Sequence, residues 1–156
     1  MSEITKLSDQ PSETLRALNN AFARETSYLD EDGWARLTGL ARFALATPDA
    51  FLIGLDQDAD YDSPNFLWFR DRYERFAYID RVVVAASAHG QGLGRALYER
   101  LFAETKTAGY PCVMAEVNVV PPNPGSLAFH EKMGFEAVGE AELATDKTVR
   151  YFARTL

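Results

Sequence analysis

The sequence predicts a single α+β domain in which about four helices flank a mixed, mostly antiparallel sheet of roughly six to seven strands. In the middle of the chain, a long helix connects two apolar strands, which predicts one parallel pair. The other strand-like segments follow one another with shorter connections, which favours antiparallel neighbours. The chain has 156 residues with no internal repeat and no long linker, so we expect one domain over residues 1–156.

The composition is typical of a globular protein, with 47% hydrophobic and 12% aromatic residues. The formal charge of −7 disfavours a nucleic-acid partner and weakly favours a cationic substrate, although ordinary solubility is the better explanation of the charge. No apolar run has membrane-spanning length, and the polar N-terminus does not resemble a signal peptide. The lone Cys112 excludes an intrachain disulfide and a multi-cysteine metal site. We therefore expect a cytoplasmic protein with no membrane association and no metal.

The N-terminal third predicts a short strand at residues 4–7 and two helices. Ser12 is expected to cap the first helix. The acidic residues 30–32 are expected to begin the second helix, and the helix-breaking residues 47–49 are expected to end it. The expected inner faces are Leu15, Leu18 and Phe22 in the first helix and Trp34, Leu37, Ala41 and Ala44 in the second.

Residues 50–55 predict a buried strand, followed by an acidic loop. Its alternating Asp56, Asp58, Asp60 and Asp62 resemble part of a calcium loop, but the glycine and the distal glutamate of that motif are missing, so we interpret it as a solvated loop. The aromatic residues 66–69 are expected to form a strand hairpinned onto the strand at residues 77–84. Some of the aromatic side chains in residues 66–76 would belong to the core and others to the wall of a pocket.

The central strand at residues 77–84 leads into the glycine-rich turn HGQGLG. Simple alternation places Tyr78, Asp80, Val82 and Val84 on one face of the strand. A helix follows the turn, and the free N–H groups at its start favour an anion. Further elements are expected at residues 112–119 (strand), 126–133 (helix), 135–139 (strand) and 148–153 (strand).

The glycine spacing excludes two common nucleotide motifs. A dinucleotide fingerprint would require a third glycine at Arg95, counting from Gly90, or at Leu97, counting from Gly92. A Walker loop would require Gly-Lys followed by Ser or Thr, which is absent.

The turn instead resembles the acetyl-CoA motif of the GNAT N-acetyltransferase superfamily, Arg/Gln-x-x-Gly-x-Gly/Ala, with His89 in the first position. A second family motif, Asn-x-x-Ala/Ser-x-x-Phe-Tyr-x-x-x-Gly-Phe, matches residues 123–135 in spacing, with His130 in place of the tyrosine. Asn123 is also a good helix cap, and Asn123, Ser126 and His130 share one helix face. The resemblance covers residues 77–135, and the N-terminal third matches only in its coarse pattern.

This resemblance implies acetyl-CoA as the acetyl donor. The pyrophosphate would lie on the backbone amides of residues 90–95, and the backbone of residues 82–84 would pair with the pantetheine arm like an added strand. The residues implied in donor binding are Val82, Val83, Val84, His89, Gly90, Gln91, Gly92, Leu93, Gly94, Arg95, Asn123, Ser126, Phe129 and His130.

The resemblance leaves the proton transfers open. The family commonly protonates the CoA sulfur with the tyrosine that is His130 here, and an imidazole of ordinary pKa is only roughly a quarter protonated at pH 7. His130 is therefore an acid, a base or only a CoA contact. For the base our order is Asp80, then Glu116, then Tyr78, which occupies the position of a glutamate used by some members. Pairing of Asp80 with Arg81 is an equally good alternative, and a base acting through water is another.

The function that the resemblance implies is acetyl transfer to a primary amine of a small-molecule or amino-acid-like acceptor. Protein or peptide N-acetylation is an alternative that usually needs an open groove, whereas the aromatic segment favours a closed pocket. A non-catalytic CoA-binding regulatory module is another alternative, because His89 and His130 depart from the motifs. Homodimers are common among similar enzymes, and the sequence leaves the oligomeric state open.

Overall fold

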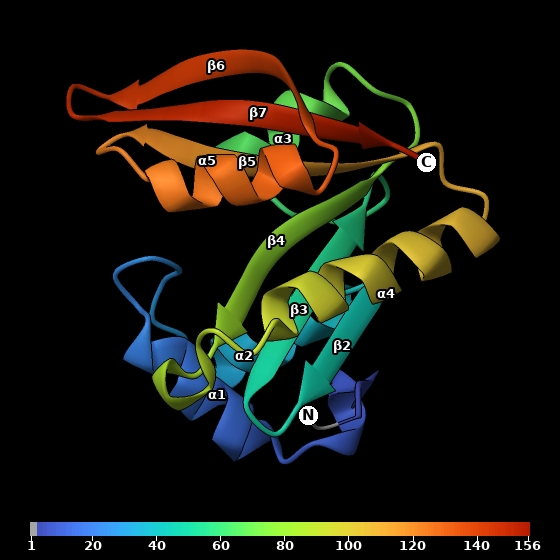
Figure 1. The fold of residues 1–156 in the computed structure, drawn as a ribbon, viewed down its shortest axis with the longest axis vertical. Helices are drawn as coiled ribbons and strands as arrows, with labels where there is room; N and C mark the ends of the chain where they lie inside the picture. Colours follow the sequence, from blue (N-terminus) through green and yellow to red (C-terminus); the bar gives the residue numbers. More distant parts are fainter. Residues whose placement is uncertain (1–2) are drawn as a thin grey trace.

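The computed structural model describes residues 3–156 and contains a seven-stranded sheet in the order β1-β2-β3-β4-β5-β7-β6 (Figure 1). The strands are β1 (Thr5–Lys6), β2 (Phe43–Thr47), β3 (Ala50–Asp56), β4 (Ala77–Val84), β5 (Cys112–Val120), β6 (Glu136–Ala144) and β7 (Lys147–Thr155). The helices are α1 (Ser12–Ala21), α2 (Glu31–Leu40), α3 (Pro64–Arg70), α4 (Leu93–Thr107) and α5 (Pro124–Lys132), with 3-10 turns η1 (Leu7–Asp9) and η2 (Ala86–Ala88).

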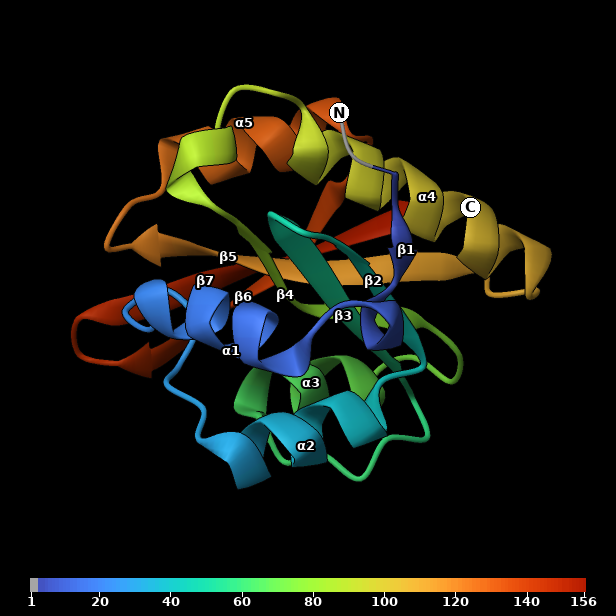
Figure 2. The same cartoon turned by 90° about the horizontal axis from the view of Figure 1, so that it is seen from below.

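Helices cover both faces of the sheet (Figure 2). Helices α4 and α5 lie on one face, which we call the α4/α5 face, and helices α1, α2 and α3 lie on the other, the α1–α3 face. Each face has its own apolar core. Leu97 and Leu101 of α4 belong to the first, and Trp34 of α2 and Phe66 and Phe69 of α3 belong to the second. No helix of residues 3–156 combines the length and the apolarity needed to cross a membrane.

The predicted fold class is confirmed: the sheet is antiparallel except for the parallel β4/β5 pair, which α4 connects. Two expectations about the type of secondary structure are wrong. The segment 66–69 is not a strand but part of α3, which begins with Pro64 at a position that suits proline. Phe66 and Phe69 are three residues apart and both fully buried, which is helical spacing.

The second correction concerns the end of α2. This helix ends at Leu40, and Ala44, which was expected on its inner face, lies in β2 instead. Strand β2 forms a hairpin with β3 around residues 48–49. Pairing with a buried neighbour outweighs the helix propensity of the alanine-rich segment, because propensity is a weak local preference. A smaller difference is that Ser12 is the first residue of α1 and Pro11 its N-cap.

Strand β4 contains a β-bulge that the alternation pattern did not reveal. Arg81 pairs with Ile53 and Ile79 pairs with Gly54, so Asp80 is an extra residue opposite the junction. The extra residue reverses the alternation beyond it. Tyr78 and Val83 therefore pack in the core of the α1–α3 face, while Val82 and Val84 pack against the core of the α4/α5 face. The expected common face of Tyr78, Asp80, Val82 and Val84 is thus wrong.

The pairing of β4 with β5 is short. It comprises Ala77 with Val113 and Tyr78 with Met114, after which the strands diverge (Figure 1). Strand β4 remains paired with β3 as far as Val84, and β5 remains paired with β7 as far as Val120. The result is a V-shaped opening in the middle of the sheet, which we call the β4/β5 opening.

Candidate functional site

The β4/β5 opening presents backbone groups that have no strand partner. Within residues 3–156, β4 has no ladder partner on the side of β5 beyond Tyr78, although Val82, Val83 and Val84 are all paired in register with β3 on the other side. Interior backbone groups normally need hydrogen-bond partners. An extended ligand lying along this edge can supply them in the way that an added strand would.

The glycine-rich turn lies where β4 passes through η2 into α4. Gly90 and Gly92 have φ values of 82° and 77°, which strongly favour glycine. Gly92 is the N-cap of α4 and provides no side-chain cap, so the first N–H groups of the helix are free to bind an anion. A Cβ atom at Gly90, Gly92 or Gly94 would meet nothing within 4 Å in the described part of the chain, so the backbone is open to close approach.

The side chains of the turn have different surroundings. Leu93 is buried in the core, Gln91 is exposed, and Arg95 is exposed and pairs with Glu99 at 2.8 Å. The exposed His89 bonds through Nε2 to the carbonyl oxygen of Val84 at 2.9 Å, which links the turn to the end of β4. What the turn offers a ligand is therefore mainly backbone.

Helix α5 follows the sequence expectation closely. The Asn123 side chain accepts a hydrogen bond from the backbone N–H of Ser126 at 3.3 Å, and Pro124 begins the helix. Phe129 packs edge-on against Tyr98 of α4, with ring centroids 5.1 Å apart. This contact ties α5 to α4 on the α4/α5 face.

His130 is enclosed between α5 and α4. Its Nδ1 lies 2.8 Å from the carbonyl oxygen of Ser126, and its Nε2 lies 2.8 Å from the hydroxyl of Tyr98. A carbonyl only accepts, so Nδ1 carries the hydrogen and Nε2 accepts from Tyr98. Burial lowers the pKa of His130, which favours this neutral tautomer. These contacts favour a packing role over that of a proton donor.

Glu116 lies on β5, in contact with residues of the α1–α3 face. Its Oε1 accepts hydrogen bonds from the Tyr78 hydroxyl at 2.8 Å and from Nδ2 of Asn65 at 3.1 Å. Its Oε2 is shielded from solvent and has no hydrogen-bond partner among residues 3–156. Burial raises the pKa of Glu116 to about 8, and the nearby Asp80 acts in the same direction, while the bonds from Tyr78 and Asn65 lower it.

Asp80, which was expected first as the base, already has a hydrogen-bond donor at each carboxylate oxygen. Its carboxylate accepts from the Tyr61 hydroxyl at 2.7 Å and from Nε of Arg81 at 2.7 Å, and its side chain is only 5% exposed. Arg81 continues to Asn19 of α1 at 2.9 Å and to Ser27 at 3.3 Å. The contacts therefore favour the alternative in which Asp80 pairs with Arg81, and this pair connects β4 to the helices of the α1–α3 face.

The structure thus brings Tyr78 and Glu116 together and separates them from His130, which bonds to α4. Sequence reasoning missed Asn65, Tyr98 and Tyr151. The signal available for Asn65 was Ser63-Pro64, which is typical of a helix start. Nothing local could indicate that it would meet a glutamate 51 residues away.

The acidic loop after β3 has ordinary structural contacts. The Asp56 carboxylate accepts from the backbone N–H of Asp58 at 3.0 Å and from the Tyr110 hydroxyl at 2.6 Å. Over residues 3–156, the structure contains no group of three or more histidine, cysteine, aspartate or glutamate side chains that could hold a metal ion.

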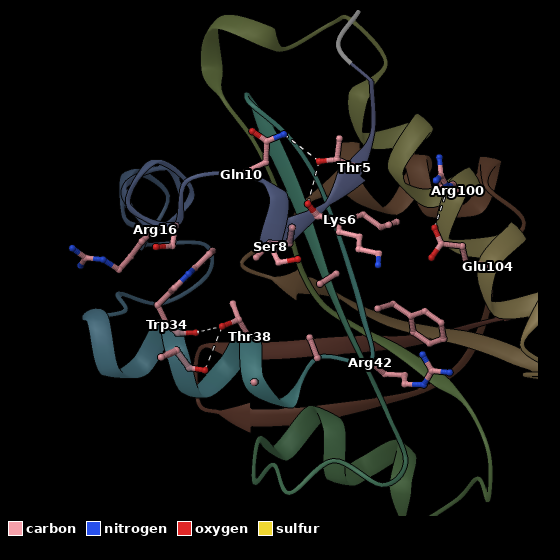
Figure 3. A pocket seen from close by; sticks show the side chains of 18 of the residues that line it. Thr5, Lys6, Ser8, Gln10, Arg16, Trp34, Thr38, Arg42, Arg100 and Glu104 are labelled. Atoms are coloured by element: carbon pink, nitrogen blue, oxygen red, sulfur yellow. Dashed lines mark hydrogen bonds and ion pairs between the residues drawn. The ribbon is translucent and has the colours of Figure 1, made fainter.

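A cavity of about 1320 Å³ lies at the edge of the sheet that β1 and β2 form, and α1, α2 and α4 also line it (Figure 3). Lys6, Arg16, Arg42 and Arg100 are among its lining residues. None of the donor-binding or proton-transfer residues expected from the sequence lines it. Its size alone therefore does not make it the reaction site.

The comparisons with known proteins agree with this geometry. The model of the acetyltransferase (GNAT) family matches residues 14–135. The ribosomal-protein-S18-alanine N-acetyltransferase from Escherichia coli is 21% identical over 99% of this chain and 94% of its own, with a TM-score of 0.69. The ribosomal-protein-alanine N-acetyltransferase from Brucella melitensis is 19% identical over 99% of both chains, with a TM-score of 0.74.

An aminoglycoside 6′-N-acetyltransferase complexed with coenzyme A is also similar, with 16% identity over 98% of this chain and 96% of its own and a TM-score of 0.73. At these identities the likeness concerns the fold. A search of curated proteins found no match. The family match spans most of the chain and includes the glycine-rich turn, β5 with Glu116, and α5. The protein therefore belongs to the acetyltransferase (GNAT) family.

Proposed function

We propose that this N-acetyltransferase transfers acetyl from acetyl-CoA to a primary amine of a small-molecule or amino-acid-like acceptor by direct attack on the thioester. The observation that carries the proposal is the β4/β5 opening. Among residues 3–156, it has unpaired backbone along β4, a glycine-rich helix start beside the α4/α5 face, and a carboxylate with a free oxygen among residues of the α1–α3 face.

The residues of the α4/α5 face fit the donor. The backbone of residues 90–95 would hold the pyrophosphate, because helix N–H groups and the helix dipole favour anions. The backbone of Val82, Val83 and Val84 would pair with the pantetheine arm. Asn123, Ser126 and Phe129 would flank the donor from α5. When bound, the donor supplies the acetyl thioester.

Glu116 is the base in this proposal. As the amine nitrogen attacks the thioester carbon, a C–N bond forms and the nitrogen's proton passes to Glu116 Oε2. The C–S bond breaks with its electron pair moving to sulfur, and the thiolate takes a proton from solvent. A free N–H on the edge of β4 near Val83 or Val84 would stabilise the carbonyl oxygen. Because the pKa of Glu116 is about 8, its carboxylate form increases from neutral to alkaline pH.

His130 serves in this proposal as a packing residue beside the donor. The alternative that it protonates the departing thiolate stays a prediction, and it requires an imidazole that is charged at working pH. Burial disfavours that charge, and the neutral tautomer already uses both ring nitrogens.

A small acceptor is favoured by the segment between β3 and β4, which covers part of the α1–α3 face. Phe66 and Phe69 anchor it in the core, and Trp68 stacks on Tyr151 of β7, with centroids 4.1 Å apart. An aromatic cover beside Glu116 suits a compact ligand better than an extended chain. The fold itself occurs in enzymes named for ribosomal proteins and for aminoglycosides, so it leaves the acceptor class open.

The test is thiol release from acetyl-CoA with a panel of small amines, amino acids, aminoglycosides and N-terminal peptides, with the products identified by mass spectrometry. We expect turnover with at least one small amine. Turnover with peptides alone would support protein N-acetylation instead. Thermal stabilisation by CoA without turnover on any amine would support a binding module, and stabilisation by NAD but not CoA would reject the donor assignment. A homodimer also stays a prediction, which sedimentation can check.

A further inference from the structure

The connection between β3 and β4 is a structured segment, residues 57–76, rather than a tight hairpin turn. Several contacts fix it against the sheet. Phe66 and Phe69 are fully buried, the Tyr61 hydroxyl donates to Asp80, and Trp68 stacks on Tyr151 at an interplanar angle of 17°. Helix α3 within this segment therefore has a defined position relative to β4, β5 and β7, and so does Asn65 in its first turn.

Asn65 bridges β7 to β5. The Tyr151 hydroxyl donates to Asn65 Oδ1 at 2.9 Å, and Asn65 Nδ2 donates to Glu116 Oε1 at 3.1 Å. The direction of the amide follows from chemistry, since an ionised carboxylate only accepts and must face the NH₂ group. The hydroxyl of Tyr151 then completes the arrangement by donating to the amide oxygen.

The two oxygens of Glu116 are unequal as a result. Oε1 receives hydrogen bonds from both Asn65 and Tyr78, while the shielded Oε2 receives none from residues 3–156. A carboxylate oxygen with two donors is a poorer proton acceptor than its free partner, because those hydrogen bonds stabilise its negative charge.

We propose that Asn65 is a positioning residue for Glu116, and that Asn65 and Tyr78 together hold Oε1 so that Oε2 takes the proton from the acceptor amine. This inference rests on the proposed function, in which Glu116 is the base. It adds to the reaction a residue outside both family motifs, contributed by the segment that covers the α1–α3 face. The amine loses one proton to Oε2 as its C–N bond forms, and that proton passes to water that enters as the product leaves.

The charge of Glu116 depends on several neighbours besides Asn65. The titratable groups that interact with it or with its hydrogen-bonding partners are Tyr78 and Asp80 of β4, Tyr98 of α4, Tyr151 of β7, Tyr61 of the covering segment and Arg72, which acts on Tyr151. Asn65 is uncharged, so its removal withdraws a hydrogen bond from the carboxylate without changing the local charge. The pKa of Glu116 should therefore rise.

The test compares the wild type with Asn65→Ala and Tyr151→Phe in the pH profile of kcat/KM, from about pH 6 to pH 10. Asn65→Ala should lower kcat/KM at neutral pH by about tenfold and move the rising limb about one pH unit upward. Tyr151→Phe keeps the ring that stacks on Trp68 and removes only the hydroxyl, so it should give a smaller shift in the same direction. KM for acetyl-CoA should stay unchanged in both.

Arg70→Ala is the matched control, because Arg70 is exposed on the same helix and bonds to none of these groups. It should leave the profile unchanged. A second readout, the ¹³C NMR titration of the Glu116 carboxyl group, does not depend on turnover and should show the same upward shift in Asn65→Ala. If Asn65→Ala lowers the melting temperature but leaves both the pH profile and the titration in place, Asn65 is only structural and the proposal is wrong.

Failure of the proposed function has a different signature. If Glu116→Gln retains wild-type turnover, Glu116 is not the base, whatever the titration of Asn65→Ala shows. If Asn65→Ala fails to fold, Tyr151→Phe tests the proposal in its place. A pH profile of kcat/KM and an NMR titration of Glu116 that are both unchanged in Tyr151→Phe would reject the positioning role of Asn65.

Discussion

The two sides of the β4/β5 opening are built differently. On the α4/α5 face, the elements proposed to bind the donor are continuous segments, residues 89–95 and 123–130, and the turn offers mainly backbone. On the α1–α3 face, the proposed chemistry depends on the side chains of Glu116, Tyr78, Asn65 and Tyr151, which come from β5, β4, α3 and β7. The proposed donor site is therefore encoded locally, whereas the proposed reactive side is assembled by tertiary structure.

This difference has a physical basis. Backbone N–H groups at a helix start are available whatever the side chains are, provided that glycine allows the turn and the close approach. A buried carboxylate instead needs partners in three dimensions, since an unpaired buried charge is costly. Substitutions on the two faces should therefore separate donor affinity from turnover.

We expect Glu116→Gln to give the largest difference between the effect on turnover and the effect on donor affinity. Without the carboxylate, kcat should fall by about 10² to 10⁴, the range for loss of a general base, while CoA affinity stays close to wild type. Thiol-release kinetics and calorimetric titration with CoA measure the two quantities. Glu104→Gln, which alters an exposed pair with Arg100 on α4, should change neither. An equal loss of CoA affinity and turnover in Glu116→Gln would contradict the division between the faces.

The pH dependence of stability should also come from the α1–α3 face. Folding raises the pKa of Glu116 from the ordinary 4.5 to about 8, so the folded state retains a proton that the unfolded chain releases. The stabilisation is thus fully present below about pH 4.5 and is lost as the pH rises through 8, by up to about 1.4 kcal/mol per pH unit.

Urea unfolding across this interval tests the expectation, with Glu116→Gln as the control that removes the titrating group. The difference in unfolding free energy between the two proteins should depend on pH in the stated direction. A constant difference would show that the carboxyl group titrates normally in the folded protein.

His130 tests whether the α4/α5 face also contributes chemistry. His130→Phe should lower the unfolding free energy by about 1 to 3 kcal/mol, because the buried Tyr98 hydroxyl loses its partner. The double variant Tyr98→Phe/His130→Phe should recover part of this loss, since no polar group is then left unpaired. The shape of the pH profile should not change. Selective loss of a falling limb in His130→Phe would instead identify His130 as the acid.

The smallest effect is expected for Gly94→Ala. Gly94 lies in the first turn of α4 and Gly39 near the end of α2, and a Cβ at either would meet no atom of residues 3–156 within 4 Å. Both alanine variants should be as stable as wild type or up to about 1 kcal/mol more stable, as helix propensity predicts. Only Gly94→Ala should weaken CoA binding, by about tenfold or 1.4 kcal/mol. Equal CoA affinities in the two variants would show that the donor does not contact the turn closely.

Sequence reasoning could predict the elements of the α4/α5 face because their determinants are local. The glycines before α4 and the Asn123-Pro124 start of α5 each specify a conformation within a few residues. The parallel pair followed from the long helix between two apolar strands, so the fold class was accessible as well.

The α1–α3 face was not accessible in the same way. Each aromatic residue, taken by itself, prefers a β-strand. This preference concealed the three-residue spacing of the buried Phe66 and Phe69, which is helical. The contact between Asn65 and Glu116 joins segments 51 residues apart and leaves no local pattern. Asp80 ranked first as base from simple alternation along β4, and the bulge at that residue is invisible to such a count.

Because side chains alternate along β4, the strand is sensitive to an inserted residue. One extra residue in its paired part would lengthen the strand by only about 3.3 Å. It would, however, exchange the two faces on one side of the insertion, so that either Tyr78 would turn away from Glu116 or Val82 and Val84 would leave their core. Deletion of Asp80, the residue without a pairing partner in the ladder with β3, would instead leave these three side chains on their present faces. We therefore expect natural variants of this chain to accommodate insertions in the loop at residues 57–63 and to exclude them from this strand.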